Sequence, residues 1–150
     1  MSIKSQEKNM RKLADLLSHD LGYIWGEKES GPNGDKKVFL NTGKAFLRTL
    51  AKDLGLRDVK VRTSPGGIAI SGSCSLIGMW KENGLYIQIS QSSVGSNLDV
   101  LYRTVRHKDD YTGGHNCWLT RRDLARMSYR QFLDTLLMLR KEDVSYERAA

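Results

Sequence analysis

From Val59 to Ser90 the sequence is VKVRTSPGGIAISGSCSLIGMWKENGLYIQIS. Apolar and polar residues alternate through most of it, which is the period-two pattern of strands with one covered and one wetter face. Ser64 to Gly67 and the pair Asn83-Gly84 interrupt the alternation, and both are turn sequences. The alternation resumes from Leu98 to Arg106, after a loop rich in Ser and Gly. These segments predict an antiparallel sheet of about four strands, with Gly72 at a bulge or a close backbone approach.

Helical periodicity precedes the sheet. Apolar residues at spacings of three and four predict an amphipathic helix from about Ser5 to Ser18. A second helix is expected to begin at Asn41 or Thr42, either of which suits an N-cap, and to end at Gly55, which suits a left-handed cap. The segment from Glu27 to Lys37 contains Gly-Pro-Asn-Gly among charged residues, and this composition predicts a surface loop.

Two successive capping boxes follow the sheet. They predict a short helix from Thr120 to Met127 and a longer one from Ser128 to Lys141, with Asp123 and Gln131 as the N3 partners. Residues 1–150 are therefore predicted to form a single α+β domain, an antiparallel sheet flanked by two N-terminal and two C-terminal helices. The core face of the last helix is expected to comprise Tyr129, Phe132, Leu133, Leu136 and Leu137.

The charge balance narrows the class of partner. The 150 residues include 24 Lys and Arg against 17 Asp and Glu, for a formal net charge of +7. Such a surplus favours negatively charged partners, either nucleic acid or an acidic protein surface. Solubility alone also accounts for a net charge of this size on a small domain.

Several classes of protein are disfavoured by the composition. No apolar run approaches the ~18 residues of a membrane span, so no membrane partner is expected. The polar N-terminus lacks the apolar core of a signal peptide. Cys74 and Cys117 lie in different contexts that suggest no disulfide framework, and free thiols fit a reducing compartment. We expect a cytoplasmic protein without a cofactor.

The case for nucleic acid rests on scattered cations and aromatic rings. No RNP, KH or zinc-finger pattern occurs, and the last predicted helix is too apolar to enter a DNA groove. If the cations converge, they form a basic patch in which aromatic side chains stack on bases. The proposed binding residues are Lys60, Arg62, Arg103, Arg106, Lys108, Tyr111, Trp118, Arg121 and Arg122.

The segment from His107 to Cys117 is the densest in reactive side-chain types. A metal hypothesis would use His107, Asp109 or Asp110, His115 and Cys117, although their spacing matches no established zinc motif. A nucleophile hypothesis would pair Cys117 with His115, without an identifiable third group to orient the base. The sequence favours a structural loop, with neither a metal nor a catalytic residue assigned.

Four short parts of the sequence carry a resemblance to other proteins. Residues Gly66 to Gly72, Leu101 to Arg103, Asp110 to Gly114 and Trp118 resemble stretches of small uncharacterised proteins encoded by phages and plasmids. The resemblance covers mainly the middle third of the chain, and no functional residue is carried over from it. It implies an accessory protein of a mobile element, a class that often binds nucleic acid or disables host proteins.

The leading hypothesis is a small basic module that binds nucleic acid and is not an enzyme. One alternative is an inhibitor or interaction protein acting on a host defence or regulatory factor, through an exposed sheet edge or the loop from Gly31 to Lys37. The other alternative is an enzyme that uses the segment from His107 to Cys117.

Overall fold

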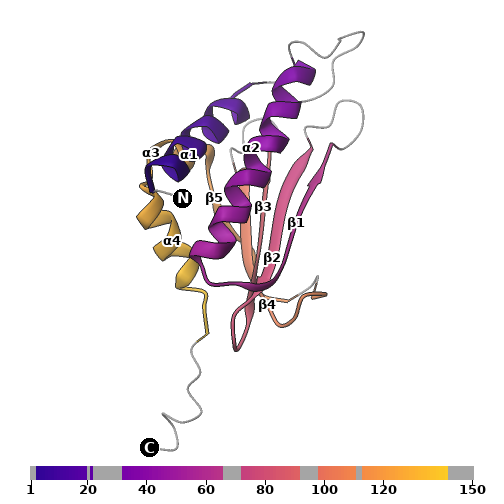
Figure 1. Ribbon diagram of the computed structural model, residues 1–150, viewed down its shortest axis with the longest axis vertical. Helices are drawn as coiled ribbons and strands as arrows, with labels where there is room; N and C mark the ends of the chain where they lie inside the picture. The colour runs from indigo at the N-terminus through magenta and orange to yellow at the C-terminus, as the bar shows by residue number, and fades with distance from the viewer. Residues whose placement is uncertain are drawn as a thin grey trace, which may run out of the picture.

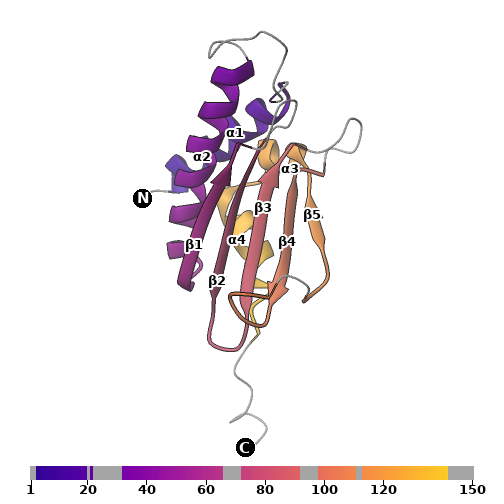
Figure 2. The same ribbon diagram turned by 90° about the vertical axis from the view of Figure 1, so that its right-hand side faces the viewer.

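Helices cover one face of an antiparallel sheet and leave the other face open, as Figure 1 and Figure 2 show from two directions. The computed structural model describes residues 3–19, 21, 32–65, 72–91, 98–110 and 113–141. None of the helices in these ranges is both long and apolar enough to cross a membrane. The elements are α1 (Ile3–Leu17), α2 (Pro32–Asp53), β1 (Arg57–Ser64), β2 (Ser73–Met79), β3 (Gly84–Ser90), β4 (Val100–Val105), β5 (Cys117–Leu119), α3 (Arg121–Arg126) and α4 (Tyr129–Leu137).

The sheet has five strands in the order β1-β2-β3-β4-β5, and every neighbouring pair is antiparallel. The predicted α+β class is thus confirmed, with one strand more than the expected four or so. The additional strand, β5, comprises Cys117–Leu119 and pairs with β4. Three residues are too few to show a period-two pattern, which is why the sequence did not indicate this strand.

The β2–β3 hairpin forms where it was predicted, but its turn is placed differently. Asn83 and Gly84 were expected to be the two central turn residues. Instead Lys81 and Glu82 occupy the tip, and the Trp80 N–H donates to the Asn83 carbonyl at 2.7 Å. Gly84 is the first residue of β3.

The side chain of Asn83 explains this shift. Its amide nitrogen donates to the Leu139 carbonyl at 2.9 Å, and its amide oxygen accepts from the Lys141 N–H, also at 2.9 Å. Asn83 therefore joins the hairpin to the residues that follow α4. These contacts require the Asn83 side chain to face the helices, which places Asn83 beside the turn and not at its tip.

Helix α2 begins earlier than predicted, at Pro32. Proline suits the first helical position, because its fixed φ is helical and its missing N–H would have no partner there. Asp35 adds a favourable charge in the first turn. Thr42, proposed as a cap, is buried inside the helix, whereas Gly55 adopts the expected left-handed conformation with φ 70°. The part of the predicted loop before Pro32 lies outside the described residues.

Both C-terminal capping boxes are confirmed. Thr120 Oγ1 accepts from the Asp123 N–H at 3.1 Å, and the Asp123 carboxylate accepts from the Thr120 N–H at 2.8 Å. Ser128 and Gln131 exchange the equivalent hydrogen bonds at 3.0 and 2.9 Å. Helix α4 ends at Leu137, before the predicted Lys141.

A buried polar cluster ties α1, α2 and α4 together. The Tyr129 hydroxyl donates to Asp53 Oδ2 at 2.6 Å and accepts from Gln6 Nε2 at 3.2 Å. Gln6 also donates to the Phe46 carbonyl at 3.1 Å. Burial raises the pKa of Tyr129 well above its usual range, so the hydroxyl keeps its proton and remains a donor. Each buried polar group in the cluster has a partner, which avoids the cost of an unmade hydrogen bond.

Helix α2 approaches the sheet closely at Gly43. A Cβ added to Gly43 would lie 2.4 Å from Cys74 Sγ in β2, well inside van der Waals contact. The absence of a side chain at Gly43 therefore lets α2 rest directly on the sheet. Cys74 is fully buried at this point, and its thiol faces the α2 backbone, 3.7 Å from the Leu40 carbonyl.

This contact predicts the sign of the stability change that Gly43→Ala would cause. In an isolated helix Gly43→Ala would stabilise by about 1 kcal/mol. Here we expect destabilisation by about 1–3 kcal/mol, because the added methyl overpacks the interface. Urea unfolding should measure it. Cys74→Ala removes the clashing sulfur, so the double variant should lose less stability than the sum of the single variants. A Gly43→Ala protein as stable as the unmodified one would contradict the close approach.

Candidate functional site

The open face is made of alternate strand residues whose neighbours are buried under the helices. In antiparallel strands, residues directly opposite one another point to the same side. Cys74, Ile87 and Val100 are fully buried on the helical side, so the residues between them face outward. The open face includes Lys60, Arg62, Ser73, Ser75, Ile77, Tyr86, Gln88, Ser90, Leu101, Arg103 and Trp118.

The register arranges one set of these residues in a line across all five strands. We call it the transverse row, and it reaches from the edge strand β1 to the edge strand β5. At about 4.8 Å per strand, its ends lie roughly 19 Å apart. Its members, in order, are Arg62, Ser75, Gln88, Leu101 and Trp118.

A second row lies beside the first and contains Lys60, Ile77, Tyr86 and Arg103. The Arg103 guanidinium sits over the Tyr86 ring, with Cζ 5.0 Å from the ring centroid. This is a cation–π contact, which the ring quadrupole makes attractive. Tyr86 therefore already has a cation on its ring.

Uncharged polar side chains connect along β3. The Tyr86 hydroxyl donates to Gln88 Oε1 at 2.7 Å, and Gln88 Nε2 donates to Ser90 Oγ at 3.4 Å. Burial raises the pKa of Tyr86, while the Arg103 charge and a hydrogen bond with Ser75 act in the opposite direction. The phenol thus stays protonated near neutral pH, and the side chains of β3 present uncharged amide and hydroxyl groups on the open face.

The charge on the open face is one-sided. Asp58, which adopts φ 54° at the irregular start of β1, is the only acidic residue of the five strands. Lys60 and Arg62 are exposed on β1. The β1 edge is therefore positive, with no carboxylate in the strands beyond it.

The structure brings three of the sequence-predicted residues together on this face as exposed side chains. Lys60 and Arg62 lie at the β1 edge, and Trp118, which is 46% exposed, lies at the β5 edge. Arg103 is on the same face but only 7% exposed. Its guanidinium donates to the Gly113 carbonyl at 2.7 Å and to the Asp110 carbonyl at 3.3 Å, so it holds the loop after β4.

Asp110 organises that loop. Its side chain, 1% exposed, pairs with Arg106 Nε at 3.0 Å and accepts from the Arg106 and Gly113 N–H groups at 3.0 and 2.9 Å. Arg106 therefore already has a carboxylate partner, whereas Lys108 is exposed in the same turn. Tyr111 lies outside the described residues.

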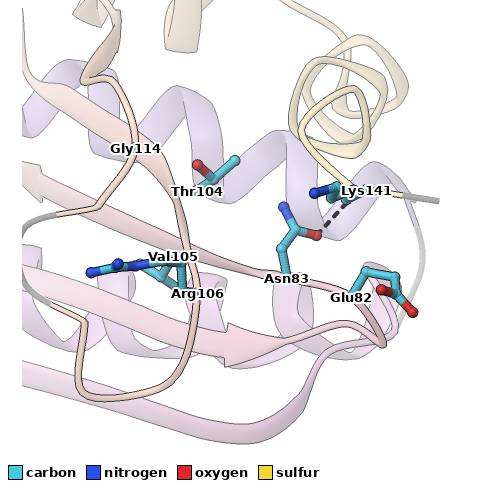
Figure 3. Close-up of a pocket in the computed structure, with 7 residues that line it drawn as sticks. All are labelled: Glu82, Asn83, Thr104, Val105, Arg106, Gly114 and Lys141. Carbon is cyan, nitrogen blue, oxygen red and sulfur yellow. Dashed lines mark hydrogen bonds between the residues drawn. The ribbon is translucent and has the colours of Figure 1, made fainter. Parts of the chain in front are cut away.

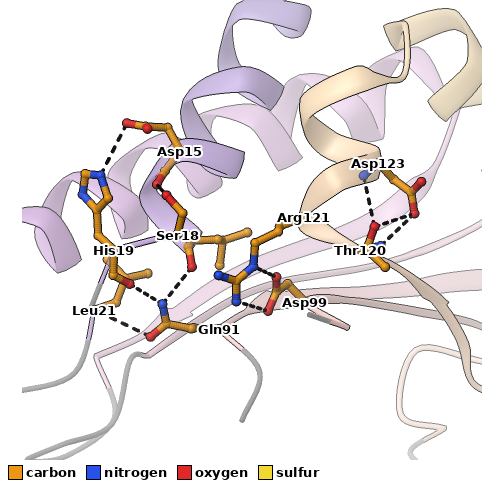
Figure 4. A network of polar contacts seen from close by, with 10 residues as sticks. Asp15, Ser18, His19, Leu21, Gln91, Asp99, Thr120, Arg121 and Asp123 are labelled. Atoms are coloured by element: carbon orange, nitrogen blue, oxygen red, sulfur yellow. Dashed lines mark hydrogen bonds and ion pairs between the residues drawn. The ribbon is translucent and has the colours of Figure 1, made fainter. Parts of the chain in front are cut away.

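Arg121 and Arg122 are on the helical side, where α3 packs against α1. Arg121 Nε donates to Asp99 Oδ2 at 2.7 Å, and that carboxylate is fully buried (Figure 4). Breaking such a pair would leave an uncompensated buried charge. Arg122 is exposed beside it. The structure thus separates these two cations from Lys60 and Arg62.

Gln91 fixes the end of α1 to the end of β3 in the same region (Figure 4). Its amide nitrogen donates to the Leu17 carbonyl at 2.8 Å and to the His19 carbonyl. Its amide oxygen accepts from the Leu21 N–H at 3.4 Å. These bonds satisfy backbone groups that a helix end leaves without a partner.

The metal hypothesis and the nucleophile hypothesis for the segment from His107 to Cys117 find little support in the described residues. No three His, Cys, Asp or Glu side chains among them lie close enough to hold a metal ion. The Cys117 thiol donates to the His115 backbone carbonyl at 3.6 Å, and this contact does not involve the imidazole. Asp110 is committed to the loop.

A small cavity lies beside the β2–β3 hairpin (Figure 3). Its volume of about 220 Å³ is below the ~300 Å³ at which ligand pockets usually begin. It combines one carboxylate with two cations and has no aromatic wall. The residues that line it are Glu82, Asn83, Thr104, Val105, Arg106, Gly114 and Lys141.

Comparison of the chain with protein-family models, curated proteins and solved structures found no match. The candidate site therefore rests on geometry. Ser75, Gln88 and Ser90 belong to it and were absent from the predicted binding set. Their signal was present in the sequence, since each polar residue alternates with a buried one in β2 or β3.

The two thiols should react differently. Burial raises the pKa of Cys74 to about 12, whereas Cys117 is only half-buried. We expect iodoacetamide at mildly alkaline pH to modify Cys117 alone, with Cys74 reacting only after unfolding, as mass spectrometry can show. The raised pKa also means that stability falls as pH rises from about 9 towards 12, since only the unfolded chain releases that proton readily. Equal labelling rates of the two thiols in the folded protein would contradict this assignment.

Proposed function

We propose that the protein binds nucleic acid through the open face of its sheet. One observation carries the proposal: Lys60, Arg62 and Trp118 are exposed on one uncovered face of the sheet, whose five strands contain no acidic residue beyond Asp58 at the start of β1. Lysine and arginine neutralise phosphates and release their counterions. An exposed indole provides a stacking surface for any base.

The set of direct contacts proposed here is narrower than the set predicted from sequence. Arg106 and Arg121 have buried carboxylate partners, and Arg103 holds the loop after β4. We assign these three a structural role. Lys108 is exposed in the turn after β4 and remains a candidate for a phosphate contact.

A protein partner is the second candidate function, and the shape of β1 favours it. This eight-residue edge strand is exposed at every position except Val61 and carries Arg57, Lys60 and Arg62. Edge strands accept an additional strand from a partner, and the cations would select an acidic segment. Co-purification with a single acidic protein, without nucleic acid, would favour this function. The cytoplasmic location and the origin in a mobile element remain predictions.

Removing the two β1 cations should weaken binding and its salt dependence together. For a single-stranded oligonucleotide, log K falls with log salt by about 0.7 per neutralised phosphate, so Lys60→Ala/Arg62→Ala should lower the slope by about 1.4. Affinity at low salt should fall at least about tenfold, since each hydrogen bond to a charged group contributes about 1.5–3 kcal/mol. Fluorescence anisotropy over a salt series measures both quantities.

The matched control is Arg126→Ala/Arg130→Ala, which removes two exposed cations from the helical side. It lowers the net charge by the same amount and should leave the slope nearly unchanged. Equal losses in the two double variants would point to net charge in place of a site. No detectable binding of single-stranded or duplex nucleic acid at low salt would refute the proposed function.

A further inference from the structure

We infer that the ligand is a single strand that crosses the five β-strands along the transverse row, with a base on Trp118 and phosphates at Arg62 and Lys60. This inference rests on the proposed function and adds the class of nucleic acid and its path. Three features of the open face support the inference. They are the unobstructed transverse row, the chemistry at the two ends of this row, and the distance between those ends.

The second row is closed at its β4 end. Arg103 is nearly buried because the Asp110 and Gly113 carbonyls bind its guanidinium. The same guanidinium covers the Tyr86 ring, which leaves that ring poorly placed to accept a base. In the transverse row, by contrast, Leu101 is half-buried and Trp118 beyond it is exposed. A ligand that starts at β1 therefore reaches an aromatic surface along the transverse row.

The chemistry of this path fits unpaired bases. Stacking on Trp118 requires a base face that a duplex keeps inside its own stack. Between the two ends, Ser75 and Gln88 offer hydroxyl and amide groups, which match the polar edges of bases. A duplex would place phosphates on both flanks of the sheet, yet among the described residues of the open face the exposed cations lie on β1 alone. Charge complementarity thus favours a single strand.

The separation of the two ends sets a minimum length. A span of roughly 19 Å, at about 3.4 Å per stacked nucleotide, corresponds to about six nucleotides of a stacked strand, and an extended strand covers it with fewer. A dinucleotide can engage one end or the other but cannot engage both. A longer strand gains from the second contact, because that contact forms at a high effective concentration.

The test compares thymidine oligonucleotides of two lengths, a dinucleotide and a strand of about eight nucleotides, on the unmodified protein and on its variants. We expect the longer strand to bind the unmodified protein far more tightly. Trp118→Ala should weaken the longer strand about five- to hundredfold, the range seen when a stacking side chain is removed. In Trp118→Ala and in Arg62→Ala, the ratio of the two affinities should shrink, because only one end remains.

Two controls guard against a trivial loss of structure or charge. Trp118→Phe keeps an aromatic ring in the short strand β5 and should retain most of the length dependence. Met138→Ala removes an exposed apolar side chain after α4, on the helical side, and should change neither affinity. Thermal unfolding of each variant separates folding from binding.

The outcomes distinguish this inference from the proposed function. A length ratio that Trp118→Ala leaves intact, or duplex binding as tight as single-strand binding, would overturn the crossing path, and loss of affinity in Lys60→Ala/Arg62→Ala would still support the proposed function. If no oligonucleotide of either kind binds, the proposed function itself fails.

Discussion

Burial of one face of the sheet under α1, α2 and α4 is the constraint on which the rest of the structure depends. Cys74, Leu76, Ile87, Ile89 and Val100 are fully buried there. Because strand side chains alternate with a period of two, fixing these residues inside also fixes their neighbours outside. The transverse row is therefore a by-product of the core. A register slip of one residue would bury Arg62 and Gln88 and expose the apolar set, which the hydrophobic effect opposes strongly.

The elements that the sequence predicted well are those whose signals are local. Capping boxes need four neighbouring residues, and the alternation in β2 and β3 is visible within seven. The predicted start of α2 was wrong because the sequence Gly31-Pro32-Asn33-Gly34 suggests a loop, although proline is also a favoured first residue of a helix. Strand β5 was missed because its pairing partner, and not its own sequence, makes it a strand.

The candidate site was harder to predict for a related reason. Arg103, Arg106 and Arg121 have the same side chain as Arg62, and no motif in the sequence shows that each is bound to another part of the protein. Their partners are set by the tertiary structure: a buried carboxylate for Arg121 and a folded loop for the other two. The count of 24 Lys and Arg residues consequently overstates the number of cations that a ligand can meet. What the sequence did predict correctly is the outward placement of Lys60 and Arg62, since it follows from the alternation alone.

The contacts of Tyr129 bear on the order in which the molecule is made. Gln6 and Glu7, near the start of the chain, bind the hydroxyl and the backbone N–H of Tyr129, more than a hundred positions later. During synthesis, α1 and α2 thus emerge from the ribosome long before the helix that completes their burial. Until α4 has been translated, the apolar surfaces of α1 and α2 must be kept from binding elsewhere. The packing of α1 and α2 can for this reason be completed only once α4 is available.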